Sequence, residues 1–412
     1  MNRRTFLKAL AAAQAAALLR PSDADASLPS AKITRVRIYR PPNLNPLFNQ
    51  SNMLVTVETD VGITGIGEGG VKDTLEQCAG TLIGKNPFRI ESIWQEAYIA
   101  WFYPPGREKA HALGALDLAL WDIKGKALGV PVHELLGGVA RDYCECYLTG
   151  GAPPGTSPTA KLSLRERARA TIEAGYRAYR MGAGDVPIGD VYDTRSMVRR
   201  IEQECREARE GVGPDGDWCI DFHQRFDLSD AVRCCKAIEP HDPFFVEDPV
   251  RDEHALADIP KLRQMTTVPL THGEEWGLRW DFNRLVESHD VDFIRATLPN
   301  VGGITEMMKV AAICETHAVG IIPHFTGPVA TAALVHCLST FSGRVMLEHY
   351  PGGPPVDYLP EWLDFKNGKA YTNQRPGLGV TADLKRLTQI GEVTEPGRRM
   401  IFRRPDGSLT HW

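Results

Sequence analysis

The stretch WCIDFH (218–223) is an apolar strand pattern that ends on an acid, Asp221. The same pattern returns twice, as FFVEDP with Glu247 and as PLTHGEE with Glu274. The gaps between the three acids are 26 and 27 residues, which fits one strand and one helix. Because the carboxyl ends of successive strands in a parallel barrel meet at one mouth, the spacing predicts that three carboxylates converge there.

Converging carboxylates repel one another unless a positive charge lies between them. All-oxygen ligands suit a hard cation, so the three acids are candidate ligands of Mg²⁺ before Zn²⁺. The alternative for any single acid is a helix N-cap. The interval continues, however, with gaps of 23, 27 and 24 residues to Thr297, His324 and Glu348. This recurrence favours a common mouth over unrelated helix caps.

Length and charge narrow the classes of function. A chain of 412 residues predicts two domains, and a hydrophobic content of 43% supports a large core. The net charge of −5 provides no basic surface for nucleic acid. No segment is apolar over a membrane-spanning length, so stable membrane insertion is not expected.

Residues 1–26 are expected to be an export signal outside the fold. Arg3 and Arg4 precede Phe-Leu-Lys and an Ala/Leu-rich stretch, a pattern similar to a bacterial twin-arginine signal. A small-x-small cleavage site, Ala-Asp-Ala, ends the segment. The mature protein is then periplasmic or secreted. The alternatives are an amphipathic helix or an uncleaved anchor.

The cysteine pattern argues against a disulfide framework. Nine cysteines are an odd count, and most lie in apolar strand or helix patterns. Cys144 and Cys146 lie two apart on a predicted strand, a poor geometry for a zinc site. We expect nearly all nine to be small buried hydrophobes.

Three blocks follow the signal. Residues 27–142 indicate an α+β domain with an amphipathic helix over 110–129. In 143–350, short apolar strands alternate with helices, which is typical of parallel βα units. Residues 351–412 begin with a Pro/Gly-rich stretch, contain a predicted hairpin in NGKAYTNQRPGLGV, and are expected to return to the first domain.

The stretch ALDLALWDIKGKALGVPVHELLGG, the Asp/Glu/Glu series and the block order resemble the enolase superfamily of the mandelate racemase/muconate lactonizing enzyme type. The resemblance implies an α/β fold, a modified (β/α) TIM-type barrel with an α+β capping domain. It implies one Mg²⁺ per subunit on Asp221, Glu247 and Glu274, a carboxylate substrate of the acid-sugar class, and a homo-oligomer. The reaction would begin by removing the proton α to a carboxylate, chemistry for which this superfamily is a standard example.

The strand ends resemble the mannonate dehydratase branch. Many relatives carry a Lys-x-Lys pair after the second barrel strand, but GYRAYRMGAG has Arg180 and Gly182 there. Arg180 with Tyr192 resembles the Arg/Tyr base pair of that branch, and the DFH sequence that starts at Asp221 resembles its Asp-x-His motif. DFIRATLPNVGGITE is similar to its sixth-strand stretch.

This resemblance implies an acid-sugar dehydratase with a mannonate- or gluconate-like substrate. Arg180 and Tyr192 would take the C2 proton, with the Arg180 cation lowering the pKa of the phenol. His223 would protonate the departing 3-hydroxyl and yield a 2-keto-3-deoxy acid. His324 would bind the substrate or assist the base, although Thr297 replaces the aspartate that usually supports it.

Three further residues are candidate substrate contacts. Glu348 would contact a carboxylate oxygen of the substrate or order a water molecule. Arg295 is either structural or substrate-facing. Trp101, in the WFYPPG segment, and the loop 41–50 are expected to cover the mouth.

Two other functions stay open at this point. A racemase or epimerase would use two opposed bases, and His223 and His324 could serve. A non-catalytic protein that binds a metal and a sugar acid would also fit export. Formation of a keto acid separates a dehydratase from a binder, and deuterium uptake without keto acid indicates an epimerase.

Export gives the first testable outcome. Replacing Arg3 and Arg4 by Lys should trap full-length protein in the cytoplasm, because the paired guanidinium groups define the signal. Cell fractionation and mass spectrometry of the N-terminus measure this, with residues 1–26 expected to be absent from wild-type periplasmic protein. Unchanged export of the Lys variant would contradict the twin-arginine interpretation.

Overall fold

A computed structural model describes residues 28–42, 53–101, 106–150, 161–182, 192–351, 356–397 and 401–410. The predicted export signal lies outside these residues, so export stays a prediction. Most of the two segments expected to cover the mouth, 41–50 and 101–106, also lies outside them.

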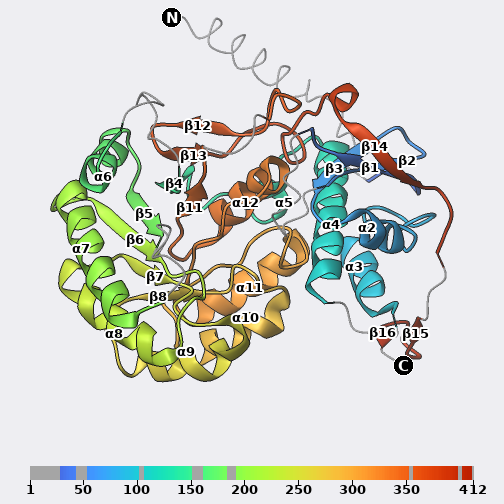
Figure 1. The fold of residues 1–412 in the computed structure, drawn as a ribbon. Coiled ribbons are helices and arrows are strands. Elements are labelled where there is room, and N and C mark those ends of the chain that lie inside the picture. Colours follow the sequence, from blue (N-terminus) through green and yellow to red (C-terminus); the bar gives the residue numbers. More distant parts are fainter. Residues whose placement is uncertain are drawn as a thin grey trace, which may run out of the picture.

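The first domain packs helices on one antiparallel sheet, at the blue and teal end of Figure 1. The sheet has the strand order β14-β1-β2-β3. Its strands are β1 (Ile33–Arg40), β2 (Leu54–Thr59), β3 (Thr64–Glu68) and β14 (Thr388–Val393). Its helices are α2 (Lys72–Ala79), α3 (Ile90–Ile99), α4 (Arg107–Leu128) and α5 (Val132–Leu135).

The second domain is a barrel of parallel strands surrounded by helices, on the left of Figure 1. The strands are β4 (Tyr143–Leu148), β5 (Ala178–Gly182), β6 (Asp217–Asp221), β7 (Phe245–Glu247), β8 (Leu270–His272), β9 (Phe293–Ile294), β10 (Gly320–Ile321) and β11 (Leu347–His349). They pair in chain order from β4 to β10, and β11 pairs with β4. A bridge between Ile321 and Val345 closes the ring.

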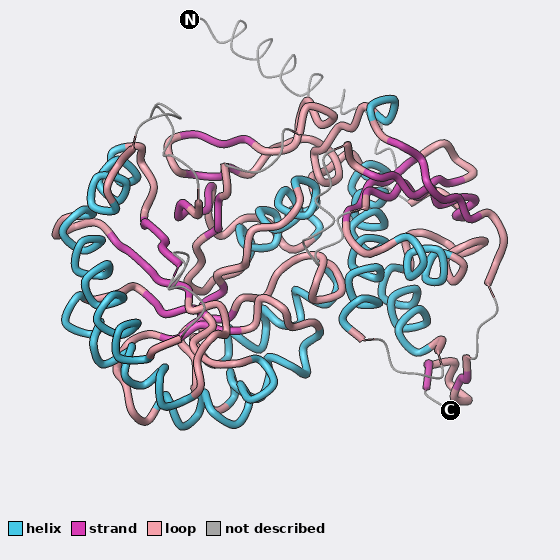
Figure 2. The backbone as a smooth tube through the Cα atoms, in the orientation of Figure 1, coloured by secondary structure: helices cyan, strands magenta, loops and turns pink. Residues whose placement is uncertain are grey.

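A helix follows each of the first seven barrel strands and packs outside the ring, which Figure 2 shows as a cyan layer around the magenta strands. These helices are α6 (Leu164–Glu173), α7 (Thr194–Val212), α8 (Leu228–Ile238), α9 (Ala255–Arg263), α10 (Leu278–Glu287), α11 (Ile304–Thr316) and α12 (Pro328–Thr340). Short 3₁₀ turns lie at Glu239–His241, Asp252–His254 and Leu384–Arg386. The predicted fold class, a modified (β/α) barrel with an α+β capping domain, is confirmed.

Helix α4 follows from its sequence and joins the two domains. Its apolar residues recur at helical spacing, and Gly129 ends it in the left-handed conformation, with φ 69°. The helix begins three residues before the predicted range 110–129. Its buried face contacts β3, α2 and α3 on one side and α11 on the other.

The C-terminal segment serves both domains. Strands β12 (Asp364–Lys366) and β13 (Lys369–Tyr371) form a hairpin that adds to β4, and β14 pairs with β1 of the capping sheet. The turn is Asn367-Gly368, both at positive φ. The predicted hairpin started at Asn367, which is in fact the first residue of the turn. The first strand of the hairpin, β12, therefore lies before the predicted range.

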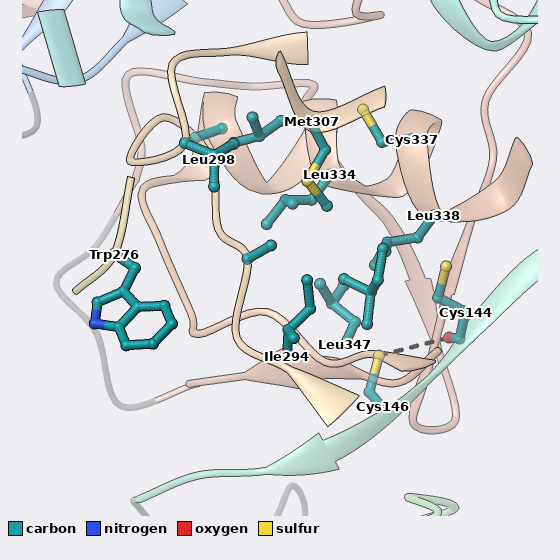
Figure 3. Packing of buried hydrophobic residues seen from close by; sticks show 14 of the residues in the cluster. Cys144, Cys146, Trp276, Ile294, Leu298, Met307, Leu334, Cys337, Leu338 and Leu347 are labelled. Carbon is teal, nitrogen blue, oxygen red and sulfur yellow. Dashed lines mark hydrogen bonds between the residues drawn. The ribbon is translucent and has the colours of Figure 1, made fainter. Parts of the chain in front are cut away.

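All nine cysteines are buried and none is in a disulfide, which confirms the expected role as small hydrophobes. Cys144, Cys146 and Cys337 pack with leucines of α12 in Figure 3, where the Cys146 thiol donates to the Cys144 carbonyl. Burial raises the pKa of the Cys144 thiol to about 12. In the described part of the chain, no helix is both long enough and apolar enough to cross a membrane.

Asp122 of α4 is a buried junction between the capping sheet and the C-terminal segment. Its carboxylate accepts from the Ile66 amide at 2.9 Å and from the Leu378 amide at 2.8 Å. The Lys126 ammonium lies 2.6 Å away. Burial raises the pKa of Asp122 against these three donors.

Asp122→Ala should therefore leave two buried amides without a hydrogen-bond acceptor, at a cost of about 1–3 kcal/mol each. We expect a loss of about 2–5 kcal/mol in the free energy of unfolding, measured by denaturant or thermal unfolding. Glu287→Ala on the surface of α10 is the control and should change stability by less than about 0.5 kcal/mol. Equal effects of the two changes would contradict the junction role.

Candidate active site

Three carboxylates converge at the carboxyl ends of neighbouring strands. Asp221 is the last residue of β6, Glu247 is the last residue of β7, and Glu274 follows β8 by two residues. Gly273, with φ 106°, turns the chain between β8 and Glu274. One oxygen from each acid lies within 4.8 Å of the others.

The three acids offer the oxygen atoms that a cation needs. Both oxygens of Glu247 and one of Glu274 are buried without a hydrogen-bond partner among the described residues. Burial raises the pKa of Glu247 well above its ordinary value, and it raises that of Glu274 as well. In both acids the removal of water from around the carboxylate is the main cause.

Two arginines supply part of that charge. Arg180, on β5, pairs with Asp221 and lies 3.9 Å from Glu247. Although burial opposes its charge, these acids raise the pKa of Arg180. Arg295 follows β9, and its guanidinium lies 2.7 Å from Glu247.

The donor set fits a divalent cation. Asp221, Glu247, Glu274 and the neighbouring Glu348 carry four negative charges when ionised, and the two arginines return two. The remaining charge of minus two, and the carboxylate oxygens that lack a hydrogen-bond partner among the described residues, match Mg²⁺ in charge and ligand type.

Arg295 does not face the mouth. Its side chain has no exposed surface, and it also pairs with Glu348 at 2.6 Å. It donates to the Tyr147 hydroxyl and to the carbonyls of Ile322 and Pro323 inside the barrel. Of the two roles left open for Arg295, these contacts favour the structural one, because the neighbouring carboxylates hold the guanidinium inside.

His223 contacts the cluster from the third barrel strand. Its Nε2 lies 2.6 Å from Asp221 Oδ2 and 3.2 Å from a nitrogen of Arg180. The residue lies beyond the end of β6, at φ 50°, so the strand itself does not place it. Instead, its backbone amide donates to Asp221 Oδ1 at 2.6 Å. Burial lowers its pKa, but Asp221 outweighs burial and the pKa is raised.

His324 contacts the cluster from the opposite side. Its Nε2 lies 3.7 Å from Glu274 Oε2, and the side chain is 10% exposed. Because β10 and β6 are four strands apart in the eight-stranded ring, His324 and His223 flank the cluster. Thr297 accepts from the His324 backbone amide at 2.8 Å, so this sixth-strand residue holds the main chain.

Glu348, on β11, is engaged by the protein itself. It accepts from the Thr149 hydroxyl at 2.6 Å and from the Phe325 amide at 2.9 Å. Burial would raise its pKa, but Arg295 and then His324 outweigh burial and hold the pKa below the ordinary value. Glu348 is thus an ionised anchor for the segment next to His324.

Tyr192 has a different environment from the one expected. Its hydroxyl donates to Asp230 of α8 at 3.0 Å, and its side chain is 52% exposed. Burial and then the Asp230 carboxylate raise the pKa of Tyr192 to about 12. The expected lowering by Arg180 is corrected, because the neighbour is an anion. The described residues place no contact between Tyr192 and the cluster.

Trp101 lies at the end of the α3 region in the capping domain. The Lys109 ammonium lies 5.0 Å from its ring centre. Among the described residues, Trp101 makes no recorded contact with the carboxylate cluster. Its expected role over the mouth stays a prediction.

A second buried network lies directly behind the ligands and was missed from the sequence. His272 Nδ1 lies 3.0 Å from Asp248, which also accepts from the Gly273 amide at 3.0 Å. Burial lowers the pKa of His272, but Asp248 and Asp252 outweigh it and raise the pKa to about 9. The available signal was one more polar residue beside each ligand, in VEDP and THGEE. These residues fix the backbone that carries Glu247 and Glu274.

Comparisons with known proteins agree with this geometry. The mandelate racemase/muconate lactonizing enzyme N-terminal domain matches residues 36–137, and the enolase C-terminal domain-like family matches 163–386. A protein named D-galactonate dehydratase from Xanthomonas oryzae pv. oryzae is 35% identical over 398 residues, which cover 92% of this chain and 100% of the relative. One of the same name from Pectobacterium atrosepticum is 34% identical over 397 residues, with the same coverage.

Solved structures show the same fold. An enolase superfamily member from Salmonella Typhimurium has a TM-score of 0.79 and 26% identity, covering 88% of this chain and 100% of its own. A mandelate racemase/muconate lactonizing enzyme from Jannaschia sp. CCS1 has a TM-score of 0.78 and 27% identity, covering 86% and 96%. With both domains matched in order and the acid triad at the barrel mouth, this chain belongs to the enolase superfamily, in the mandelate racemase/muconate lactonizing enzyme group.

Proposed function

We propose that this protein is a Mg²⁺-dependent acid-sugar dehydratase that converts a galactonate-, mannonate- or gluconate-like acid to a 2-keto-3-deoxy acid. The observation that carries the proposal is the placement of two histidines on opposite sides of a triad of buried carboxylates. Relatives at 35% identity over nearly the whole chain are named D-galactonate dehydratase, which supports the same reaction class.

A β-elimination needs one group to take a proton and another to give one. The C2–H bond breaks as a base takes the proton, and the C3–O bond breaks as an acid protonates the 3-hydroxyl, which leaves as water. The enol then gains a proton at C3 and becomes the ketone. In an anti elimination the proton and the hydroxyl leave from opposite faces of the C2–C3 bond, so a base and an acid on opposite sides of the substrate would serve the two steps.

His223 is the candidate proton donor of the two histidines. Asp221 lies 2.6 Å from its Nε2, a contact that favours the protonated ring. His324, on the other side, is then the base that takes the C2 proton. This assignment replaces Tyr192 by His324, because Tyr192 donates to Asp230 and its pKa is raised to about 12.

Asp221, Glu247 and Glu274 would hold the cation. Bound Mg²⁺ supplies positive charge against the negative charge that develops on the substrate carboxylate, worth several kcal/mol. Arg180 donates to Asp221, and its guanidinium lies 3.2 Å from His223 Nε2, so Asp221 lies between two positive groups. Glu348 and Arg295 form a buried ion pair inside the barrel, next to these residues.

A second candidate is an epimerase of a 2-hydroxy acid, since two opposed histidines also suit proton removal on one face and delivery on the other. Incubating the protein and Mg²⁺ with an acid-sugar panel separates the two. Release of a 2-keto-3-deoxy acid from a panel member supports the dehydratase. Deuterium uptake at C2 with epimer formation and no keto acid would contradict it.

The same proposal includes two further properties, assembly into a homo-oligomer and export of the mature protein.

Removal of a metal ligand should abolish activity. Asp221→Asn, Glu247→Gln and Glu274→Gln should each lose Mg²⁺ affinity and lower kcat/KM by about a thousandfold or more, since several kcal/mol are lost. Calorimetric titration with Mg²⁺ and keto-acid formation measure the two effects. Circular dichroism checks that the barrel is folded.

Asp258→Asn is the matched control, because this acid pairs with Lys261 on α9, away from the triad. It should keep activity within about twofold. Full activity of a triad variant, or of wild-type protein in metal-free buffer, would refute the role of the triad.

The histidines should separate by isotope exchange. His324→Asn should abolish both exchange of the C2 proton with solvent deuterium and dehydration, because the base is lost. His223→Asn should slow dehydration about 10²–10⁴-fold while some exchange remains. NMR of the substrate in D₂O and keto-acid formation measure the two reactions.

Tyr192→Phe tests the Arg/Tyr base pair that the mannonate dehydratase resemblance implies. It should leave both reactions within about threefold, since the hydroxyl contacts Asp230. If Tyr192→Phe abolishes exchange while His324→Asn retains it, the base is Tyr192 and the present assignment fails.

A further inference from the structure

Helix α12 lacks a cap of its own. Its N-cap is Gly327, which has no side chain, and Pro328 at the first helical position has no amide hydrogen. The next two amides belong to Val329 and Ala330, both fully buried. Buried amides without an acceptor cost about 1–3 kcal/mol each, so this helix needs a partner from elsewhere.

The partner is Glu68, the last residue of β3 in the capping domain. Its carboxylate accepts from the Ala330 amide at 3.0 Å and also from the Val329 amide. A Cβ at Gly327 would lie within 2.1–2.5 Å of the carboxylate atoms, so the acid packs directly on the glycine backbone. The Glu68 side chain is 1% exposed. Burial, against these two amides, raises its pKa to about 7.

The same loop carries His324 at its other end. His324 lies three residues before Gly327. Thr297 accepts from its amide at 2.8 Å, and Glu348 accepts from the next amide at 2.9 Å. Barrel residues therefore fix the start of the loop, and the capping domain fixes its end.

We propose that Glu68 is a positioning residue for the reaction: from the capping domain it holds the N-terminus of α12 and thereby the loop that places His324 beside the carboxylate triad. Among the described residues, Glu68 contacts the start of α12 and not the triad, so it acts on the reaction through the loop. The kinetic part of this inference rests on the proposed function, whereas the structural part does not.

The chain contains a matched control in Asp117. This buried acid of α4 accepts from the Thr305 amide at 3.0 Å and from the Thr305 hydroxyl at 2.5 Å. It caps α11, whose N-cap Gly303 also has no side chain. The loop before α11 carries Thr297, which accepts from the His324 amide, but not His324 itself, so Asp117 shares the capping role of Glu68 at one step further from the base.

Glu68→Ala and Asp117→Ala are therefore compared in the full chain with Mg²⁺. Both substitutions should lower the melting temperature by several degrees, because each leaves buried amide groups without a hydrogen-bond acceptor. Only Glu68→Ala should lower kcat about 10–100-fold, with KM within about threefold, since a base displaced by about 1 Å loses that much rate. Glu68→Gln keeps an acceptor oxygen and should recover part of the lost kcat.

Hydrogen exchange followed by mass spectrometry gives a readout that does not need activity. Glu68→Ala and, more weakly, Glu68→Gln should increase exchange in the segment 322–331, whereas Asp117→Ala should increase it in 298–307. If wild-type protein releases no keto acid from the panel, the proposed function fails, and the exchange pattern still decides the role of Glu68.

Two results would overturn the inference. One is unchanged exchange over 322–331 in the Glu68 variants. The other is an equal loss of kcat in the Glu68 and Asp117 variants, which would assign both acids to stability alone. If Glu68→Ala does not fold, Glu68→Gln against Asp117→Asn gives the same comparison with smaller changes.

Discussion

The burial of like charges at the mouth of the barrel is the constraint on which the site depends. Taking a carboxylate out of water costs several kcal/mol unless positive charge and hydrogen-bond donors replace the solvent. Here Arg180 and Arg295 replace part of it, and a divalent cation would replace the rest. The arginines therefore stabilise the buried acids, and the Glu247 oxygens, which accept no hydrogen bond from the described residues, are available to a metal ion.

This compensation also explains why the residues below the triad are polar. Arg295 reaches across the barrel from the sixth strand to Glu348 on the eighth, and Tyr147 on the first strand accepts from the same guanidinium. A wholly apolar floor would leave the acids without donors. Beneath this layer the barrel is closed by packed aromatic and aliphatic side chains: Phe245, Phe293, Ile322 and Met346.

The capping domain contributes to the barrel as well as covering it. Glu68 and Asp117 accept from the first amides of α12 and α11, two barrel helices that start on glycine. Trp94 adds a hydrogen bond of 2.7 Å to the Gly302 carbonyl in the same region. Helix N-termini carry partial positive charge, so buried carboxylates from the other domain are suited to them. The loops that carry site residues are therefore fixed by contacts from both domains.

Much of this arrangement was predictable from local signals. The strand-and-helix interval of the three acids predicted a barrel mouth, since equal spacing along parallel βα units places strand ends together. His324 was predicted as a site residue by its place in the same series, and His223 by the resemblance of its DFH sequence to an Asp-x-His motif. The boundary of the C-terminal hairpin was not predictable, because a strand of three residues is too short to show the alternation of polar and apolar residues that would locate it.

The sequence by itself determined the fold class, the metal-ligand candidates and His324, because each depends on periodic spacing along the chain, and its Asp-x-His motif indicated His223. Tertiary structure alone decided the partners of Arg295, Tyr192 and Glu68. Arg295 lies inside the barrel because three strands bring carboxylates around it, and Tyr192 donates to Asp230 because α8 packs beside the start of α7. Glu68 meets α12 across 262 residues of chain. Hydrogen bonds and ion pairs over such separations follow from how the domains pack, which no local pattern encodes.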